Sequence, residues 1–254
     1  TYYEGSWITC VIPSFFISCT LSYLSTLWGF SLERNNMNNK IQLYSLATPN
    51  GQKVSIALEE LGLEYDAHTI NIMQGEQFTD DYLTVNPNSK IPAIVDPTGA
   101  DGDPLPIMES GAILLHLAEK TGQLMSKDAR LKSETIQWLF FQVGGIGPMF
   151  GQFGHFFKFA KETCTAPYPV DRYAKETRRL LDVLEKRLEG RTYLVGEEYS
   201  IADISIFPWV GCLGQYYEAS EILELDRFKN VTIWYKKCSE RPDSIKGSTV
   251  CGFE

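Results

Sequence analysis

The sequence Thr48-Pro49-Asn50-Gly51 places a hydroxyl and a carboxamide directly before a stretch with helical periodicity. The first backbone N–H groups of a helix have no partner within the helix and lie at the positive end of its dipole. Such a position stabilises an anion, and a thiolate is one candidate. For these residues taken alone, an ordinary capped turn is the favoured explanation, and the single glycine does not indicate a phosphate-binding loop.

A second candidate is the sequence Asn88-Ser89-Lys90-Ile91-Pro92, in which a proline opens an expected strand. A proline at a strand entrance is often purely structural. If the Ile91-Pro92 bond is cis, however, Ile91 turns its backbone N–H and C=O outward. An extended, peptide-like ligand could then pair with this backbone as an added strand.

The third candidate is Glu109-Ser110-Gly111, where an expected strand leads into a helix. The Ser110 hydroxyl and the N–H groups of the first helical turn can hold a carboxylate, and the Glu109 carboxylate can hold an amine. Together they would bind the amino-acid end of a ligand. A simple helix cap remains the alternative.

The positions of the cysteines and histidines restrict the chemistry. The chain has six cysteines but none between Cys19 and Cys164, so any thiol acting near these candidates must come from a ligand. The cysteine spacing indicates no disulfide framework, which is typical of a reducing compartment, and we expect a cytoplasmic protein. The three histidines are far apart and there is no Cys-x-x-Cys pair, so we expect no metal site.

Composition excludes several classes of protein. Apolar residues make up 44% of the chain and charged residues 22%, which is typical of globular proteins. The 254 residues suit one large domain or two small ones, at roughly 150 residues per domain. The formal net charge of −9 would repel a phosphate backbone, so we expect no nucleic-acid partner.

The N-terminal residues 1–39 differ from the rest of the chain. Residues 7–32 carry no charged side chain, and their length would permit a membrane span or the apolar part of a signal peptide. No basic region precedes them, and Met37 stands just before a regular pattern that starts at Lys40. We therefore expect an extension outside the core fold, with a membrane tether as the less favoured alternative.

Residues 40–122 alternate between strand and helix patterns. The first unit is strand, helix, strand, which predicts parallel pairing with a right-handed crossover. A short helix, two strands and a capped helix follow. This layout predicts a thioredoxin-like α/β domain, with strands at 41–44, 65–72, 91–96 and 105–108 and helices at 53–61, 79–83 and 110–121.

From about residue 128 to residue 254 only helical patterns remain, so we expect an all-helical C-terminal domain. Ser200 and Asp203 have the spacing of a capping box at a helix start. Residues 144–159 are rich in glycine and phenylalanine. The glycines could let backbones approach closely or could break a helix, and the aromatic side chains could line an apolar pocket at the domain junction or pack subunits together. The expected helices cover 129–143, 171–188, 200–213 and 226–239.

The order of these three candidates within one thioredoxin-like unit resembles that of the soluble glutathione transferases, from residue 41 to the C-terminus. The resemblance is greatest to the Nu-class branch, which also resembles the transferase-like domain of a fungal nitrogen regulator. It rests on the 48–51 turn, on the blocks 88–94 and 109–114, on the run 137–149 and on the capping box at 200–203. It implies a soluble glutathione transferase fold, glutathione as co-substrate, no metal and a homodimer.

The resemblance also implies roles for individual residues. Thr48 and Asn50 would contact the glutathione sulfur, and the other expected contacts lie along the rest of the peptide. Glu109 and Ser110 would bind the γ-glutamyl end, Ile91 and the cis Pro92 the cysteinyl backbone, Lys90 the glycyl carboxylate, and Gln77 and Arg172 further parts of the ligand, although Arg172 could equally belong to a solvated helix face.

The activity implied by the resemblance is glutathione-dependent reduction of small disulfides, with weaker conjugation of electrophiles. Tyr44 near the end of the first strand could suggest a tyrosine-type transferase, but its position resembles a structural tyrosine of the Nu-type start. Two alternatives stay open. One is a conjugating detoxification transferase, and the other is a glutathione-binding regulatory module with little turnover.

Overall fold

The computed structural model describes residues 39–99 and 101–253. The expectations for the extension 1–39 therefore fall almost wholly outside the described residues. The described residues belong to one compact unit by their internal contacts. Among the helices that are described, none is both long and apolar enough to cross a membrane.

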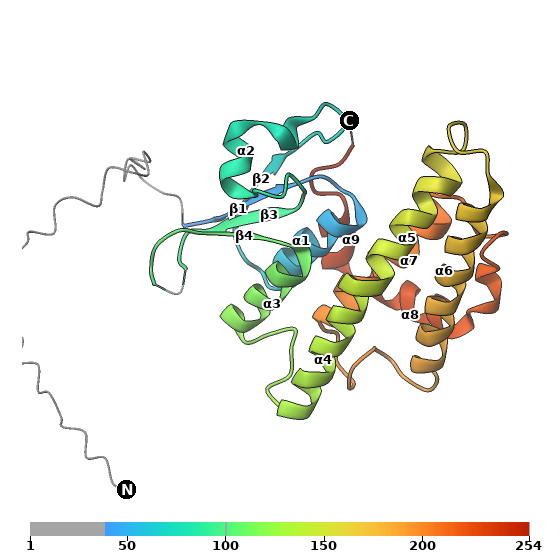
Figure 1. The fold of residues 1–254 in the computed structure, drawn as a ribbon. Coiled ribbons are helices and arrows are strands. Elements are labelled where there is room, and N and C mark those ends of the chain that lie inside the picture. Colours follow the sequence, from blue (N-terminus) through green and yellow to red (C-terminus); the bar gives the residue numbers. More distant parts are fainter. Residues whose placement is uncertain (1–38, 100, 254) are drawn as a thin grey trace, which may run out of the picture. The chain divides into compact units, whose positions relative to one another are not determined.

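A four-stranded sheet with strand order β2-β1-β3-β4 forms the first half of this unit. Strand β1 pairs in parallel with β2, and β3 runs antiparallel to both β1 and β4. Figure 1 shows α1 and α3 on one face of the sheet and α2 on the other. The bounds are β1 Ile41–Ser45, α1 Pro49–Glu60, β2 Tyr65–Thr69, α2 Asp80–Val85, β3 Ala93–Asp96, β4 Leu105–Met108 and α3 Ser110–Thr121, with a 3-10 turn at Glu76–Phe78.

The second half of the unit is helical, as the sequence predicted. Helix α7 is buried along nearly its whole length because it is apolar on all sides, which is typical of a helix at the centre of a bundle. Its capping box is present, with the Asp203 carboxylate accepting from the Ser200 N–H. The bounds are α4 Ala129–Phe141, α5 Gly147–Gly154, α6 Pro167–Arg187, α7 Ile201–Gln215, α8 Lys229–Ser239 and α9 Pro242–Ser248, with a 3-10 turn at Leu225–Arg227.

Helices α4 and α5 belong to one continuous rod, which Figure 1 shows crossing the molecule in yellow-green. Two π-helical segments, η2 at Gln142–Ile146 and η3 at His155–Phe159, occur within the rod, and so the glycines here do not end the helix. Gly154 is needed for packing, because a Cβ at this position would lie 2.0 Å from the Tyr217 ring. The buried Phe150 and Phe153 join the core.

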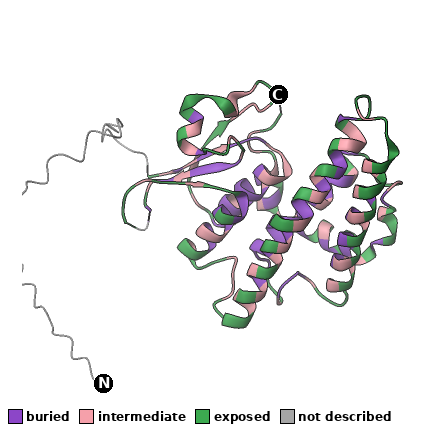
Figure 2. Ribbon diagram, viewed as in Figure 1, coloured by how far each residue is buried: buried purple, intermediate pink, exposed green. Residues whose placement is uncertain are grey.

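Helix α9 was not predicted from the sequence. It packs on α1 so closely that a Cβ at Gly247 would lie 2.5 Å from the Ile56 Cα. Arg241, just before α9, donates both Nε and Nη2 to the Glu60 carboxylate at 2.6 and 2.5 Å. The C-terminal chain therefore returns to the thioredoxin-like half. Figure 2 shows that buried residues follow the inner faces of α1, α3 and the α4–α5 rod.

Candidate active site

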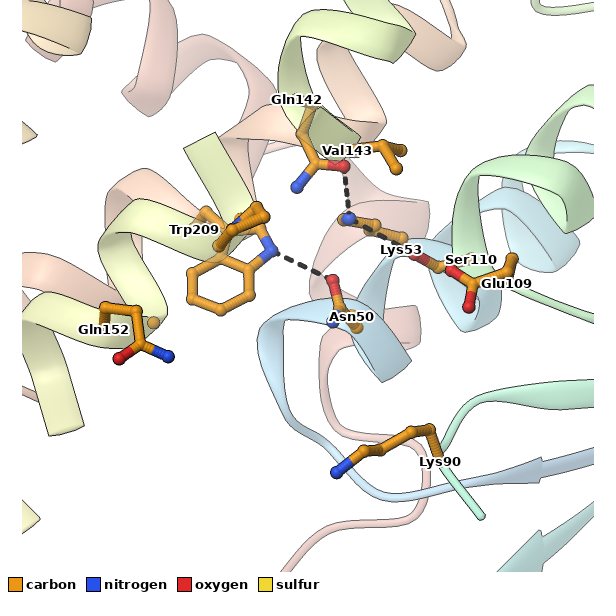
Figure 3. Close-up of a pocket in the computed structure, with 12 residues that line it drawn as sticks. Asn50, Lys53, Lys90, Glu109, Ser110, Gln142, Val143, Gln152 and Trp209 are labelled. Atoms are coloured by element: carbon orange, nitrogen blue, oxygen red, sulfur yellow. Dashed lines mark hydrogen bonds between the residues drawn. The ribbon is translucent and has the colours of Figure 1, made fainter. Parts of the chain in front are cut away.

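A cavity of about 490 Å³ opens where the N-terminal ends of α1 and α3 face the α4–α5 rod and α7 (Figure 3). Its volume is typical of small-molecule sites, about 300–1,000 Å³. Four of the residues singled out from the sequence line it. The lining comprises Asn50, Lys53, Lys90, Glu109, Ser110, Gln142, Val143, Gly147, Pro148, Gly151, Gln152 and Trp209.

The start of α1 is a capped turn. The Thr48 Oγ1 accepts from the Gly51 N–H at 3.3 Å. Gly51 allows the backbone of this turn to pass close to the Leu46 carbonyl, because a Cβ there would lie 1.9 Å from the carbonyl oxygen. Asn50 follows in the first turn, and its Oδ1 accepts from the Trp209 Nε1 at 3.0 Å. The Nδ2 amide of Asn50 is therefore the group that remains for a ligand in the cavity.

The loop before β3 has the cis Ile91-Pro92 bond that the resemblance implied. Two side chains fix this loop, since the Lys90 carbonyl accepts from the Tyr82 hydroxyl and from the Asn86 Nδ2, both at 2.6 Å. The exposed Lys90 side chain points toward the cavity in Figure 3, below the start of α1. Ile91 and Pro92 do not themselves line the cavity.

At the start of α3, Glu109 has a φ of 67°, in the left-handed region that non-glycine residues seldom adopt. Such a conformation costs about 1–3 kcal/mol and is often found at ligand sites. It leaves the Glu109 side chain exposed at the rim of the cavity, while Ser110 is 9% exposed and begins the helix. The two residues thus combine a carboxylate with free helical N–H groups.

The lining also includes Lys53, Gln142 and Trp209, which were not predicted from the sequence. Lys53 is 1% exposed, and its Nζ donates to the Ser110 Oγ at 3.2 Å and to the Gln142 Oε1 at 2.6 Å. Burial holds the pKa of Lys53 well below its usual range, against the opposing effect of the nearby Glu109 carboxylate. A lysine one turn before Ala57, on the apolar face of α1, was the signal available in the sequence.

The remaining predicted residues lie outside the cavity lining. Thr48 caps α1, and Arg172 is exposed on α6. Gln77 lies in the 3-10 turn, where its Oε1 is buried without a hydrogen-bond partner in the described chain. Tyr44 stacks on His68 at 4.7 Å between ring centroids and contacts Tyr82 edge-on, and burial raises the pKa of the Tyr44 hydroxyl above its usual value.

No cysteine thiol is among the residues that line this cavity. The described cysteines Cys164, Cys212, Cys238 and Cys251 are all unpaired, and none of them is among the lining residues. Burial raises the pKa of the Cys212 thiol to about 11, which disfavours its thiolate. No group of three or more potential metal ligands occurs in residues 39–99 and 101–253.

Two family models match the chain. The glutathione S-transferase N-terminal domain matches residues 47–120, and the glutathione S-transferase C-terminal domain matches residues 146–242. The chain is 47% identical over 203 residues to the Escherichia coli disulfide-bond oxidoreductase YfcG, which covers 80% of this chain and 91% of that protein. It is 33% identical over 251 residues to protein URE2 of Candida glabrata, with 82% of this chain and 68% of that protein covered.

A solved structure gives the same result. A glutathione transferase from Burkholderia graminis, with two glutathione molecules bound per subunit, is 53% identical with a TM-score of 0.81. The alignment covers 83% of this chain and 88% of that chain. With both family models matched in order along one fold, the chain belongs to the glutathione S-transferase family, and its relatives include the YfcG and URE2 branch.

Proposed function

We propose that this chain is a glutathione-dependent enzyme that reduces small disulfides with the thiolate of bound glutathione. The main observation is that the N-termini of α1 and α3 open into one cavity that contains Asn50, Glu109 and Ser110 but no cysteine. The naming of YfcG as a disulfide-bond oxidoreductase and the glutathione in the Burkholderia graminis structure support the proposal.

In this proposal the glutathione sulfur lies at the start of α1, near Thr48 and Asn50. Its γ-glutamyl end lies at Glu109 and Ser110. The backbone of Ile91, before Pro92, pairs with the cysteinyl residue, and the remaining polar groups hold the rest of the peptide. Lys90 would bind the glycyl carboxylate, and Gln77 would accept a hydrogen bond through its unpartnered Oε1. Arg172 would contact the ligand only in the proposed homodimer.

The reaction follows from thiol–disulfide exchange. The glutathione thiolate attacks one sulfur of the substrate disulfide, the S–S bond breaks, and one thiolate leaves. A second glutathione thiolate then attacks the glutathione sulfur of the mixed disulfide and releases the other half of the substrate. Glutathione is oxidised to its disulfide, the substrate is reduced to two thiols, and each leaving thiolate takes a proton from water.

Conjugation of electrophiles is the second candidate, because Val143, Pro148 and Trp209 give the cavity an apolar wall. Steady-state rates with glutathione against a small aliphatic disulfide and against an aryl halide decide between the two. We expect faster turnover of the disulfide, and a loss of about tenfold or more in Asn50→Ala, as for removal of a hydrogen bond to a charged group. Gln137→Ala, on the exposed face of α4, serves as the control.

A higher rate with the aryl halide would favour a conjugating transferase. Glutathione binding without turnover of either substrate would favour the regulatory module. If the Asn50→Ala variant reduced the disulfide at the wild-type rate, the glutathione sulfur would not lie at the start of α1.

We also propose that the protein is a cytoplasmic homodimer. Unpaired cysteines are typical of a reducing compartment. Exposed apolar side chains occur in both halves, with Leu105 and Met108 on β4 and Phe140 and Val143 on the rod, and large apolar patches often mark interfaces. Sedimentation equilibrium should show a dimer that Phe140→Glu dissociates and Ile233→Glu, equally exposed on α8, does not. A monomeric wild type would contradict this assembly.

A further inference from the structure

Lys53 is a buried lysine whose hydrogen-bond partners are both neutral. Its Nζ donates to the hydroxyl of Ser110 and the amide oxygen of Gln142, and it forms no ion pair with any carboxylate of the described chain. A buried charge without a counter-charge costs folding free energy, and buried charged side chains in proteins are therefore usually paired with an opposite charge. Of its three N–H donors, only two are used.

The position of Lys53 indicates where its counter-charge would come from. Ser110, which accepts from Lys53, is also the first residue of α3, where the backbone N–H groups are unpaired. An anion held at this helix start lies beside the Lys53 Nζ, because that nitrogen is 3.2 Å from the Ser110 Oγ. Figure 3 shows Lys53, Ser110 and Glu109 on one wall of the cavity, with Gln142 above them.

Gln142 keeps this charge available. Its side chain is 1% exposed and comes from the π-helical segment η2, and its Oε1 holds the Lys53 Nζ at 2.6 Å without neutralising it. A glutamate at this position would form an internal ion pair instead. The nearby charged group that acts on Lys53 is Glu109, and under the proposed function that carboxylate receives the ligand amine.

We propose that Lys53 supplies the positive charge that neutralises the α-carboxylate of the ligand's γ-glutamyl end, and that Gln142 positions it for this task. The inference rests on the proposed function. Lys53 and Glu109 would then recognise the two opposite charges of one α-amino-acid group, which makes the site specific for a zwitterionic end. In the absence of ligand, the burial that lowers the pKa of Lys53 disfavours its charged form, and a bound carboxylate restores it.

Calorimetric titration of the full chain with glutathione and two analogues tests this assignment. One analogue, γ-aminobutyryl-cysteinyl-glycine, lacks the α-carboxylate, and the other, glutaryl-cysteinyl-glycine, lacks the α-amino group. The wild type should bind glutathione about ten- to a hundredfold more tightly than the analogue without the carboxylate. In Lys53→Met, which has similar length but no charge, this preference should fall to about threefold or less.

Two controls make the comparison specific. Lys53→Met should weaken glutathione and the analogue without the amine by the same factor, because both carry the α-carboxylate. Lys90→Met removes the other lysine of the cavity and should keep the preference for the α-carboxylate intact. Gln142→Glu should weaken the binding of glutathione more than that of the analogue without the α-carboxylate, because the new carboxylate pairs with the Lys53 ammonium. This variant tests the assignment if Lys53→Met does not fold.

Equal losses for glutathione and for the analogue without the carboxylate in Lys53→Met would show that Lys53 only ties α1 to α3 and the rod. An unchanged preference in Gln142→Glu would overturn the assignment as well. If the wild type bound no glutathione, the proposed function itself would fail, which is a distinguishable result.

Discussion

At the scale of single residues, the Asn50 carboxamide is held from the opposite wall of the cavity. The Trp209 indole on α7 donates to the Asn50 Oδ1 at 3.0 Å, and both residues line the cavity. This bond orients the carboxamide and leaves its Nδ2 amide free to donate elsewhere. Under the proposed function that amide donates to the glutathione sulfur, and Trp209 is a positioning residue for the start of α1.

We expect Trp209→Phe to lower turnover of a small disulfide at neutral pH about five- to tenfold, as for loss of one hydrogen bond of about 1 kcal/mol. The KM for glutathione should change little, because the γ-glutamyl contacts remain. The pH profile of kcat should shift upward, since a less well oriented amide stabilises the thiolate less. Steady-state kinetics across pH measure both effects. Trp138→Phe, outside the cavity, is the control, and a wild-type pH profile in Trp209→Phe would refute the positioning role.

The sequence was sufficient to single out Asn50, Lys90, Glu109 and Ser110, which line the cavity, because each lies at a junction between a strand or turn and the next element. Their roles toward glutathione stay predictions. The sequence was not sufficient for Lys53, Gln142 and Trp209. Lys53 and Gln142 are 89 residues apart, and Asn50 and Trp209 are 159 apart, so only tertiary packing brings them together. In the sequence alone, a tryptophan in an apolar helix indicates core.

At the scale of elements, α9 supports the helix that carries the proposed sulfur site. Gly247→Ala should lower the free energy of unfolding by about 1–3 kcal/mol, because its Cβ would meet the Ile56 backbone and neither helix can yield easily. Gly214→Ala on α7 is a suitable control, since its nearest neighbours are at 3.6 Å. Urea denaturation measures both variants. Equal stability of the two would contradict this close packing of α9 on α1.

The buried Asp96 ties the end of β3 to α3. It accepts from the His116 Nε2 at 2.7 Å and from the Lys120 Nζ at 2.7 and 2.8 Å. Burial raises the pKa of this carboxyl, but the hydrogen bonds from Lys120, His116 and the Thr98 N–H outweigh it and hold the pKa below its usual value. The ionised form is therefore the one that stabilises the fold.

Because the folded-state pKa is lowered, the contribution of Asp96 is present above the usual aspartate pKa of about 3.9 and is lost as pH falls below it. At neutral pH, Asp96→Asn should cost about 2 kcal/mol of unfolding free energy, since it leaves Lys120 without its counter-charge. The difference from wild type should shrink below about pH 4. Thermal or urea unfolding across pH measures it, with the exposed Asp226→Asn as control. A difference that stays constant down to low pH would show that Asp96 does not act as a carboxylate.

The types of most elements could be predicted from hydrophobic periodicity, but several boundaries and the path of the rod could not. The glycines of 144–159 predicted either a close approach or a helix break. The structure shows a close approach at Gly154, whose partner, the Tyr217 ring, lies too far along the chain for a local pattern to identify. Helix α9 is short, and it is stabilised by packing on α1, which lies far away in the sequence. A local sequence pattern therefore does not predict it.

At the scale of the whole molecule, the cavity depends on both halves of the compact unit, because α1 and α3 form one wall and the rod and α7 the other. All of its lining residues lie after Met37. A protein of residues 37–254 should therefore fold and show a glutathione-dependent rise in Tm equal to that of the full chain. Insolubility that is rescued by residues 1–36 would contradict this independence.

Under the proposed function, this fold converts the thiol of bound glutathione to a thiolate at the start of α1. A free thiol has a pKa near 8.5, so about 3% is ionised at neutral pH. Lowering the pKa by about two units requires about 2.7 kcal/mol, which a hydroxyl, an amide and a helix N-terminus can supply together.

The ultraviolet absorbance of the thiolate, followed against pH with glutathione bound, measures this pKa directly. We predict that it lies well below that of free glutathione in the wild type. It should rise in both Thr48→Ala and Asn50→Ala, and it should stay nearly unchanged in Tyr44→Phe, whose ring packs on His68 and Tyr82 instead. If Tyr44→Phe abolished the thiolate while Thr48→Ala and Asn50→Ala left its pKa unchanged, this mechanism would be contradicted. The protein would then be a tyrosine-type transferase.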